Sequence, residues 1–253
     1  MKNDLVKAHL NLHAILPNLE ELVEFDPEIG QLVGSWDITV EFAVRGGPRA
    51  YVSIHNGQCR VGRGRADRAD VKLWFKSPEH LNAMFDGKAK PIPLKGFTRL
   101  GFMSSEFGKL TDRLEYYLRA SDDVLKDQRV FEFVTRCMLY TAIMGLAELA
   151  EFDPAVADLA GHTPNGTAEF SILPDGPSAH LVHQNGSFTA AKGPADAPNV
   201  RMQFRDLRVC NDLLNGRVDA FAALGRGDVV LLGFLPLADQ LNAMLEYLEP
   251  YLK

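Results

Sequence analysis

The sequence predicts an α+β protein built from two tandem copies of one unit, each a mostly antiparallel sheet with helices packed on one face. Three observations predict this fold class. The chain repeats itself at a nearly constant offset, each copy carries an Asn-Gly pair between two alternating apolar segments, and each copy closes with an amphipathic helical pattern. With 253 residues, the chain is long enough for two domains of ordinary size.

The repeat is visible without gaps over the middle of each copy. An offset of 129 aligns Gly47–Gly87 with Gly176–Gly216, and 12 of the 41 pairs are identical, whereas ordinary composition gives about two or three. Upstream, Glu24–Pro27 returns as Glu151–Pro154. The polar run 119–123 follows the last helix of the first copy, so the boundary is predicted there. Residues 1–122 form the first copy and residues 123–253 form the second.

Each copy begins with a short capped helix. Asp26 and Asp153 supply N-caps, each followed by a proline suited to the first helical position. A glycine seven residues beyond the proline, Gly34 or Gly161, is expected to end the helix. The shared EFDP motif is therefore interpreted as a structural capping signature.

Strands with period-two alternation follow in both copies. The apolar residues expected on the buried face are Ile38, Val40, Phe42, Ala50, Val52 and Ile54, then Val71, Leu73 and Phe75, with Ala168, Phe170, Ile172, Ala179, Leu181, Val200, Met202 and Phe204 as counterparts. Asn56-Gly57 and Asn185-Gly186 predict tight hairpins, because both positions accept positive φ. Ser77 and Asp206 are predicted to cap a helix that stops at a glycine, and the final helix of the second copy is expected to stop at Pro250.

Composition excludes several classes of protein. The net charge of −6 gives no basic excess for nucleic-acid binding. The N-terminal apolar residues are interrupted by charge, so the sequence indicates no signal peptide and a cytoplasmic location. The apolar stretch 130–149 contains Glu132, Arg136 and Glu148, so it predicts a buried helix and no transmembrane segment. Three widely separated cysteines indicate free thiols.

The order of these parts resembles the sterol carrier protein type 2 domain. The matching residues are Ala69-Asp70-Val71, Ser77–Leu81 and Gly87-Lys88 in the first copy, and Gly216-Arg217, Ala220-Phe221 and the Gly227–Gly233 strand in the second. In the first copy the glycine-flanked strand is shortened to Gly96–Gly101. The resemblance implies an apolar tunnel between sheet and helices that binds a lipid, a sterol or a fatty acyl group, or else an accessory role.

We therefore expect a non-catalytic binding protein for a lipid-like hydrophobic small molecule, with no cofactor. The apolar residues expected to line the tunnel are Leu81, Met84, Phe85, Phe107, Leu110 and Leu114 in the first copy, and Leu213, Leu214, Val230, Leu232, Leu241, Met244, Leu245 and Leu248 in the second. The alternative is a scaffold in which the two repeats form an internal pseudo-dimer that binds a partner protein.

Other candidate chemistry is weaker. His9 and His13 have the helical spacing of metal ligands, but a catalytic zinc needs three protein ligands, so no metal is expected. Gly62–Arg65 lacks the Lys-Ser/Thr of a phosphate loop and is interpreted as a solvated turn. An enzyme would need polar groups such as His55, Asp67 and Asp70 to converge on one cleft.

Overall fold

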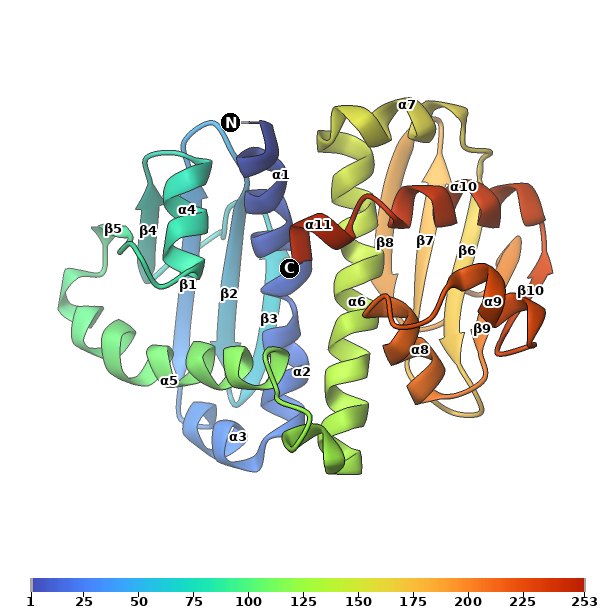
Figure 1. Ribbon diagram of the computed structural model, residues 1–253. Helices are drawn as coiled ribbons and strands as arrows, with labels where there is room; N and C mark the ends of the chain where they lie inside the picture. The colour runs from blue at the N-terminus through green and yellow to red at the C-terminus, as the bar shows by residue number, and fades with distance from the viewer. Residues whose placement is uncertain (1, 253) are drawn as a thin grey trace. The chain divides into compact units, whose positions relative to one another are not determined.

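The computed structural model describes residues 2–252 and divides the chain into two compact units, residues 1–125 and 126–253. Each unit contains one five-stranded sheet (Figure 1). The strand order is β3-β2-β1-β4-β5 in the first unit and β8-β7-β6-β9-β10 in the second, so the topology is the same.

The first unit opens with a helical segment that leads into the capped helix and the sheet. Its elements are α1 (Lys2–Leu10), the π-helix η1 (Asn11–Ile15), α2 (Asn18–Phe25), α3 (Pro27–Val33), β1 (Asp37–Val44), β2 (Arg49–His55), β3 (Gln58–Arg63), β4 (Val71–Phe75), α4 (Pro78–Phe85), β5 (Ile92–Lys95), the 3-10 turn η2 (Phe97–Arg99) and α5 (Leu100–Leu118).

The second unit repeats this order after the short turn η3 (Val124–Lys126). Its elements are α6 (Gln128–Phe152), α7 (Pro154–His162), β6 (Gly166–Ile172), β7 (Ser178–Gln184), β8 (Ser187–Lys192), β9 (Val200–Phe204), α8 (Leu207–Leu214), α9 (Ala220–Gly225), β10 (Val229–Gly233), α10 (Leu235–Leu245) and α11 (Glu249–Leu252). The leading helix α6 takes the place of α1, η1 and α2.

The sheets are mostly antiparallel, as the sequence predicts. The one parallel pair in each sheet joins the first strand of the unit to the fourth, β1 to β4 and β6 to β9. Asn56 and Asn185 have φ of 51° and 53° at the hairpin turns, which confirms the Asn-Gly prediction. Asp26, Ser77, Asp153 and Asp206 all accept backbone N–H bonds as N-caps.

The core of each unit lies between one sheet face and the helices. In the second unit α6 packs on β7 and β8, and α10 packs on β6, β9 and β10. The expected apolar residues of β1 and β4 are buried, but Thr39 and Glu41 on the other face of β1 are buried as well. Because β1 is the central strand, long side chains from its neighbours cover both faces, which alternation alone does not reveal.

Helix α6 is the one described segment that is long and apolar enough to cross a membrane, with 72% of its apolar window buried. It lies against the sheet and α8 of its own unit. That packing favours the predicted core helix, since a helix buried against a sheet has no apolar face left for lipid.

Several boundaries differ from the sequence prediction. Gly96–Gly101 is not a strand, because the fifth strand ends at Lys95 and the chain turns through η2 into α5. Gly62 and Arg63 belong to β3 and not to a turn, and a Cβ on Gly62 would come within 2.2 Å of the Tyr51 ring. Pro250 does not stop the closing helix, since α10 ends at Leu245 and the proline lies inside α11.

Candidate hydrophobic ligand site

Half of the predicted tunnel-lining residues are fully inside the core. They are Leu81, Phe107, Leu110 and Leu114 in the first unit, and Leu241, Met244 and Leu248 in the second. Trp36 adds aromatic packing against α5, with ring centroids 4.7 Å from Phe102 and 6.5 Å from Phe107. These side chains hold the closing helices in place.

A second group of predicted residues is half-buried. Met84 and Phe85 on α4, Leu213 and Leu214 on α8, and Leu245 on α10 make up this group. Sequence reasoning missed half-buried apolar neighbours on the next elements, which are Ile92, Phe102 and Met103 in the first unit and Leu224 and Leu231 in the second. Ile92, Leu224 and Leu231 lie in short elements, which give a weak periodic signal. Phe102 and Met103 lie in the first turn of α5, before the predicted stripe that starts at Phe107.

The two remaining predicted residues, Val230 and Leu232, are exposed, and they belong to a larger set of exposed apolar residues around the fifth strand of both units. Among the residues whose burial the structure describes, eight of the eleven exposed large hydrophobic ones lie between α4 or α8 and the start of the closing helix, namely Leu94, Phe97, Leu100, Phe221, Val230, Leu232, Phe234 and Leu235. In the first unit this place runs from β5 to the start of α5, and in the second it runs from α9 through β10 to the start of α10 (Figure 1).

Val230 and Leu232 do not join the other predicted lining residues. In the β9–β10 register they stand opposite Gln203 and Arg201, whereas Val229 stands opposite the buried Phe204. Since successive side chains alternate between faces, Val230 and Leu232 point to the sheet face away from the core. Leu231, on the core side, takes the position expected of a lining residue.

Buried asparagine side chains attach α4 and α8, the helices that precede the fifth strand region, to the leading helices of their units. In the first unit Asn11 Nδ2 donates to Asn82 Oδ1 (3.0 Å), and Asn82 Nδ2 donates to the Asp4 carbonyl (2.9 Å). In the second, Asn211 Nδ2 donates to Thr135 Oγ1 (3.0 Å). Asn82 and Asn211 are identical in the repeat because each ties α4 or α8 to the leading helix of its unit.

A tyrosine from the end of each unit binds the capping aspartate. The Tyr117 hydroxyl donates to Asp26 Oδ2 (3.0 Å), and that of Tyr251 donates to Asp153 Oδ2 (2.6 Å). Burial, together with the hydrogen bond to Asp26, raises the pKa of Tyr117 to about 12. The same causes raise the pKa of Tyr251. The EFDP motif is therefore a cap that also anchors the end of its unit.

A polar cluster lies on the outer face of β1 and β2, and of its members only His55 and Asp70 are candidates named from the sequence. His55 Nδ1 is bonded to Asp37, and Nε2 lies 3.4 Å from Thr39 Oγ1. The Thr39 N–H donates to Asp70 Oδ2 (2.8 Å). Counting the strand register back from the hairpin would have paired Asp37 with His55. His55 and Asp70 thus both contact Thr39, whereas Asp67, exposed in the loop between β3 and β4, takes no part in these contacts.

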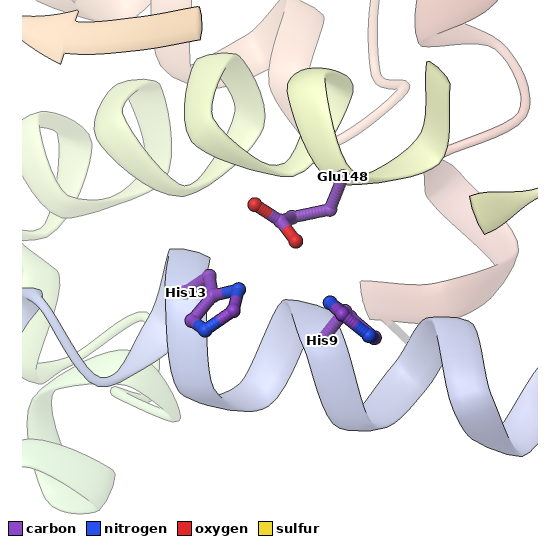
Figure 2. Close-up of side chains that lie close together, drawn as sticks. All are labelled: His9, His13 and Glu148. Atoms are coloured by element: carbon purple, nitrogen blue, oxygen red, sulfur yellow. The ribbon is translucent and has the colours of Figure 1, made fainter. Parts of the chain in front are cut away.

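His9 and His13 lie on one side of the same helical segment, with ring centroids 5.4 Å apart (Figure 2). The Nε2 atom of His13 lies 3.0 Å from the Arg49 carbonyl. This contact gives His13 a structural partner within its unit. Glu148, also labelled in Figure 2, belongs to α6 of the second unit.

None of the three cysteines is in a disulfide, as expected; Cys137 and Cys210 are buried and Cys59 is half-buried. Burial raises the pKa of the Cys210 thiol. Cys210 therefore stays protonated and packs as a small apolar residue.

Solved structures of sterol carrier protein 2 domains are similar to parts of this chain. No family model and no curated protein matches the chain. Among solved structures, sterol carrier protein domain 2 of Helicoverpa armigera is 18% identical, with 45% of this chain and 89% of that one covered and a TM-score of 0.36. Apo sterol carrier protein 2 of Yarrowia lipolytica is 14% identical, with shares of 40% and 92% and a TM-score of 0.33.

A third similar structure is a palmitated sterol carrier protein 2-like protein of Aedes aegypti, 18% identical, with 33% of this chain and 74% of that one covered and a TM-score of 0.28. The structure itself establishes the α+β fold class of both units.

Proposed function

We propose that this protein binds and carries a lipid-like hydrophobic small molecule, held between the sheet and the helices of a unit. The observation that supports the proposal is the gradation of apolar side chains around the fifth strand of each unit, from buried through half-buried to exposed. Val230 and Leu232, which face away from the core, are not part of it. Soluble proteins rarely leave such a surface without a ligand or a partner.

Burial of apolar surface supplies enough binding energy for such a ligand. Each methylene removed from water contributes about 0.8 kcal/mol, so a long acyl chain needs few polar contacts. The half-buried residues Met84, Phe85, Leu213 and Leu245 are the proposed contacts, and the fully buried ones form the wall behind them.

Native mass spectrometry after gentle purification, followed by titration with a fluorescent fatty acid, tests the proposal. We expect saturable binding that unlabelled fatty acids or sterols displace. If the protein carries no ligand and neither probe class binds saturably, the carrier function is wrong, and recovery of a protein partner would then favour the scaffold alternative.

A pair of variants on one helix separates ligand space from solid core. Leu245 is half-buried, whereas Leu241, one turn earlier on α10, is 1% exposed. Leu245→Trp should weaken binding of the probe with little loss of stability. Leu241→Trp should instead overpack the core and cost about 1 to 3 kcal/mol. Equal destabilisation by both variants, with unchanged probe binding, would place Leu245 in the core.

A further inference from the structure

The turn between α4 and α5 of the first unit combines exposed apolar side chains with a local excess of positive charge. Residues Lys88–Leu100, here called the basic turn, contain four cations and no acidic residue. The four are Lys88, Lys90, Lys95 and Arg99. The whole chain carries a net charge of −6, so this concentration of cations runs against the overall charge.

The apolar side chains of the basic turn project from a constrained backbone. Leu94, Phe97 and Leu100 are 50%, 64% and 39% exposed. The chain leaves β5 at Gly96, which has φ of 84°, and a Cβ there would come within 2.7 Å of the Asp70 carbonyl oxygen. Only glycine fits this close approach to β4. Phe97 is therefore presented to solvent by a turn fixed to the sheet.

The cations of the basic turn are mostly free of acidic partners. Within residues 2–252, neither Lys90 nor Arg99 forms an ion pair with a carboxylate, and Lys95 Nζ donates to the Ala69 carbonyl. Lys88 alone pairs with an acid, Asp86, at 3.2 Å. The charges of Lys90, Lys95 and Arg99 are thus available to an anionic partner.

The equivalent place in the second unit is apolar but not basic. Phe221, Phe234 and Leu235 are 71%, 42% and 53% exposed there. The neighbouring arginines are paired: Arg226 lies 2.7 Å from Asp228, and Arg205 is bonded to the same carboxylate. The charge difference between equivalent turns points to a partner specific to the first unit.

We propose that the basic turn docks on the surface of an anionic lipid bilayer. Phe97, Leu94 and Leu100 would enter the boundary between headgroups and acyl chains, where aromatic and aliphatic side chains are stable. Lys90, Lys95 and Arg99 would lie at the level of the lipid phosphates, which attract cations near the surface. This inference goes beyond ligand binding, and it holds whether or not either unit carries a lipid inside.

Vesicle flotation with the full chain tests the docking surface. We expect binding to vesicles of phosphatidylcholine with phosphatidylglycerol, and little binding to phosphatidylcholine alone. Replacing Lys90 and Arg99 with glutamine should weaken binding about fivefold for each cation, and Phe97→Ser should weaken it about tenfold or more. Added salt should weaken binding of the parent protein as well, because it screens surface charge.

Phe221→Ser is the matched control, because Phe221 is at least as exposed as Phe97 but lies beside paired arginines. It should leave vesicle binding unchanged. Tryptophan emission from Trp36 and Trp74, both in the first unit, verifies that Phe97→Ser is folded. Unchanged vesicle binding in Phe97→Ser, or equal loss in Phe221→Ser, would overturn the proposal. So would a Phe97→Ser protein that binds vesicles normally but loses self-association, because a second copy would then be the partner. Binding of the fluorescent fatty acid is measured separately, so loss of ligand binding and loss of docking are distinguished.

Discussion

The two units share a scaffold but differ where the fifth strand meets the closing helix. Both have the same strand order and the same capped helices. The first unit runs from Gly87 into β5 without an intervening helix, while the second inserts α9 before β10. Lys and Arg balance Asp and Glu in residues 1–125, so the net charge of −6 comes from the second unit. The two units thus share the parts that set the fold and differ in the segment around the fifth strand and in net charge.

The duplication also repeats interactions with different side chains. The Asp70 carboxylate accepts the Thr39 N–H, and the Asn199 amide oxygen accepts the equivalent Thr167 N–H (2.7 Å). Glu41 pairs with Lys72, and Glu169 pairs with Arg201. Variants at matched positions therefore measure how far each interaction is equivalent. Tryptophan emission follows the first unit alone, because Trp36 and Trp74 both lie in it, whereas circular dichroism follows both.

The largest expected difference lies in the ion pairs beneath the central strands. The Glu41 and Lys72 side chains are 4% and 30% exposed and lie 2.8 Å apart, whereas those of Glu169 and Arg201 are 9% and 45% exposed and lie 3.6 Å apart. Glu169 also accepts the Ala195 N–H (2.9 Å). Lys72→Met leaves a buried carboxylate without its cation and should cost about 3 kcal/mol. Arg201→Met should cost less than about 1 kcal/mol. Urea unfolding measures both costs, and equal losses would show that the two pairs are equivalent.

The capping aspartates come next in expected size. Asp26 accepts two backbone N–H bonds, the Tyr117 hydroxyl, and an ion pair from Arg113 at 3.0 Å. Asp153 accepts one backbone N–H and the Tyr251 hydroxyl. Asp26→Ala should cost about 2 to 4 kcal/mol, and Asp153→Ala about 1 to 3 kcal/mol. Thermal unfolding followed by tryptophan emission and by circular dichroism checks this order. A larger loss in Asp153→Ala would contradict it.

The glycines that end the fifth strands should give a smaller effect, and here the larger loss of stability is expected in the second unit. Gly96 and Gly233 have φ of 84° and 109°, and a Cβ would meet a backbone oxygen at 2.7 Å and 2.2 Å, respectively. Positive φ alone costs an alanine about 1 to 3 kcal/mol. Gly233→Ala should be the more destabilising variant, because its Cβ is closer to rigid backbone. Gly64→Ala, also at positive φ but with nothing within 4 Å, separates the cost of φ from the cost of contact.

The sequence predicted those features of the fold and of the candidate site that depend on residues close together in the chain. Asn56-Gly57, the N-caps and the buried face of β4 depend on neighbouring residues, so the pattern predicted them correctly. The fifth strand of the first unit was misplaced beyond Gly96, because two prolines and few β-branched residues hide β5. The orientation of Val230 and Leu232 depends on pairing with β9, and the exposure of Phe97 depends on a turn fixed to β4. Both features depend on contacts between elements that are distant in the sequence, which the periodicity of apolar residues does not reveal.

The smallest expected effect is a pH dependence at Tyr117. Burial and the bond to Asp26 raise the pKa of this phenol from its ordinary 10 to about 12. The protonated phenol is the form that the folded state favours, so its contribution is complete below pH 10 and is lost as the pH rises towards about 12. Tyr117→Phe should cost about 1.5 kcal/mol at pH 7, and the difference from the parent protein should shrink between these pH values. Urea unfolding followed by tryptophan emission at pH 9 to 12 measures it. Tyr251→Phe, whose tyrosine lies in the second unit, should leave the tryptophan transition unchanged, so a shift there would show that the tyrosine bonds of the two units are not separate.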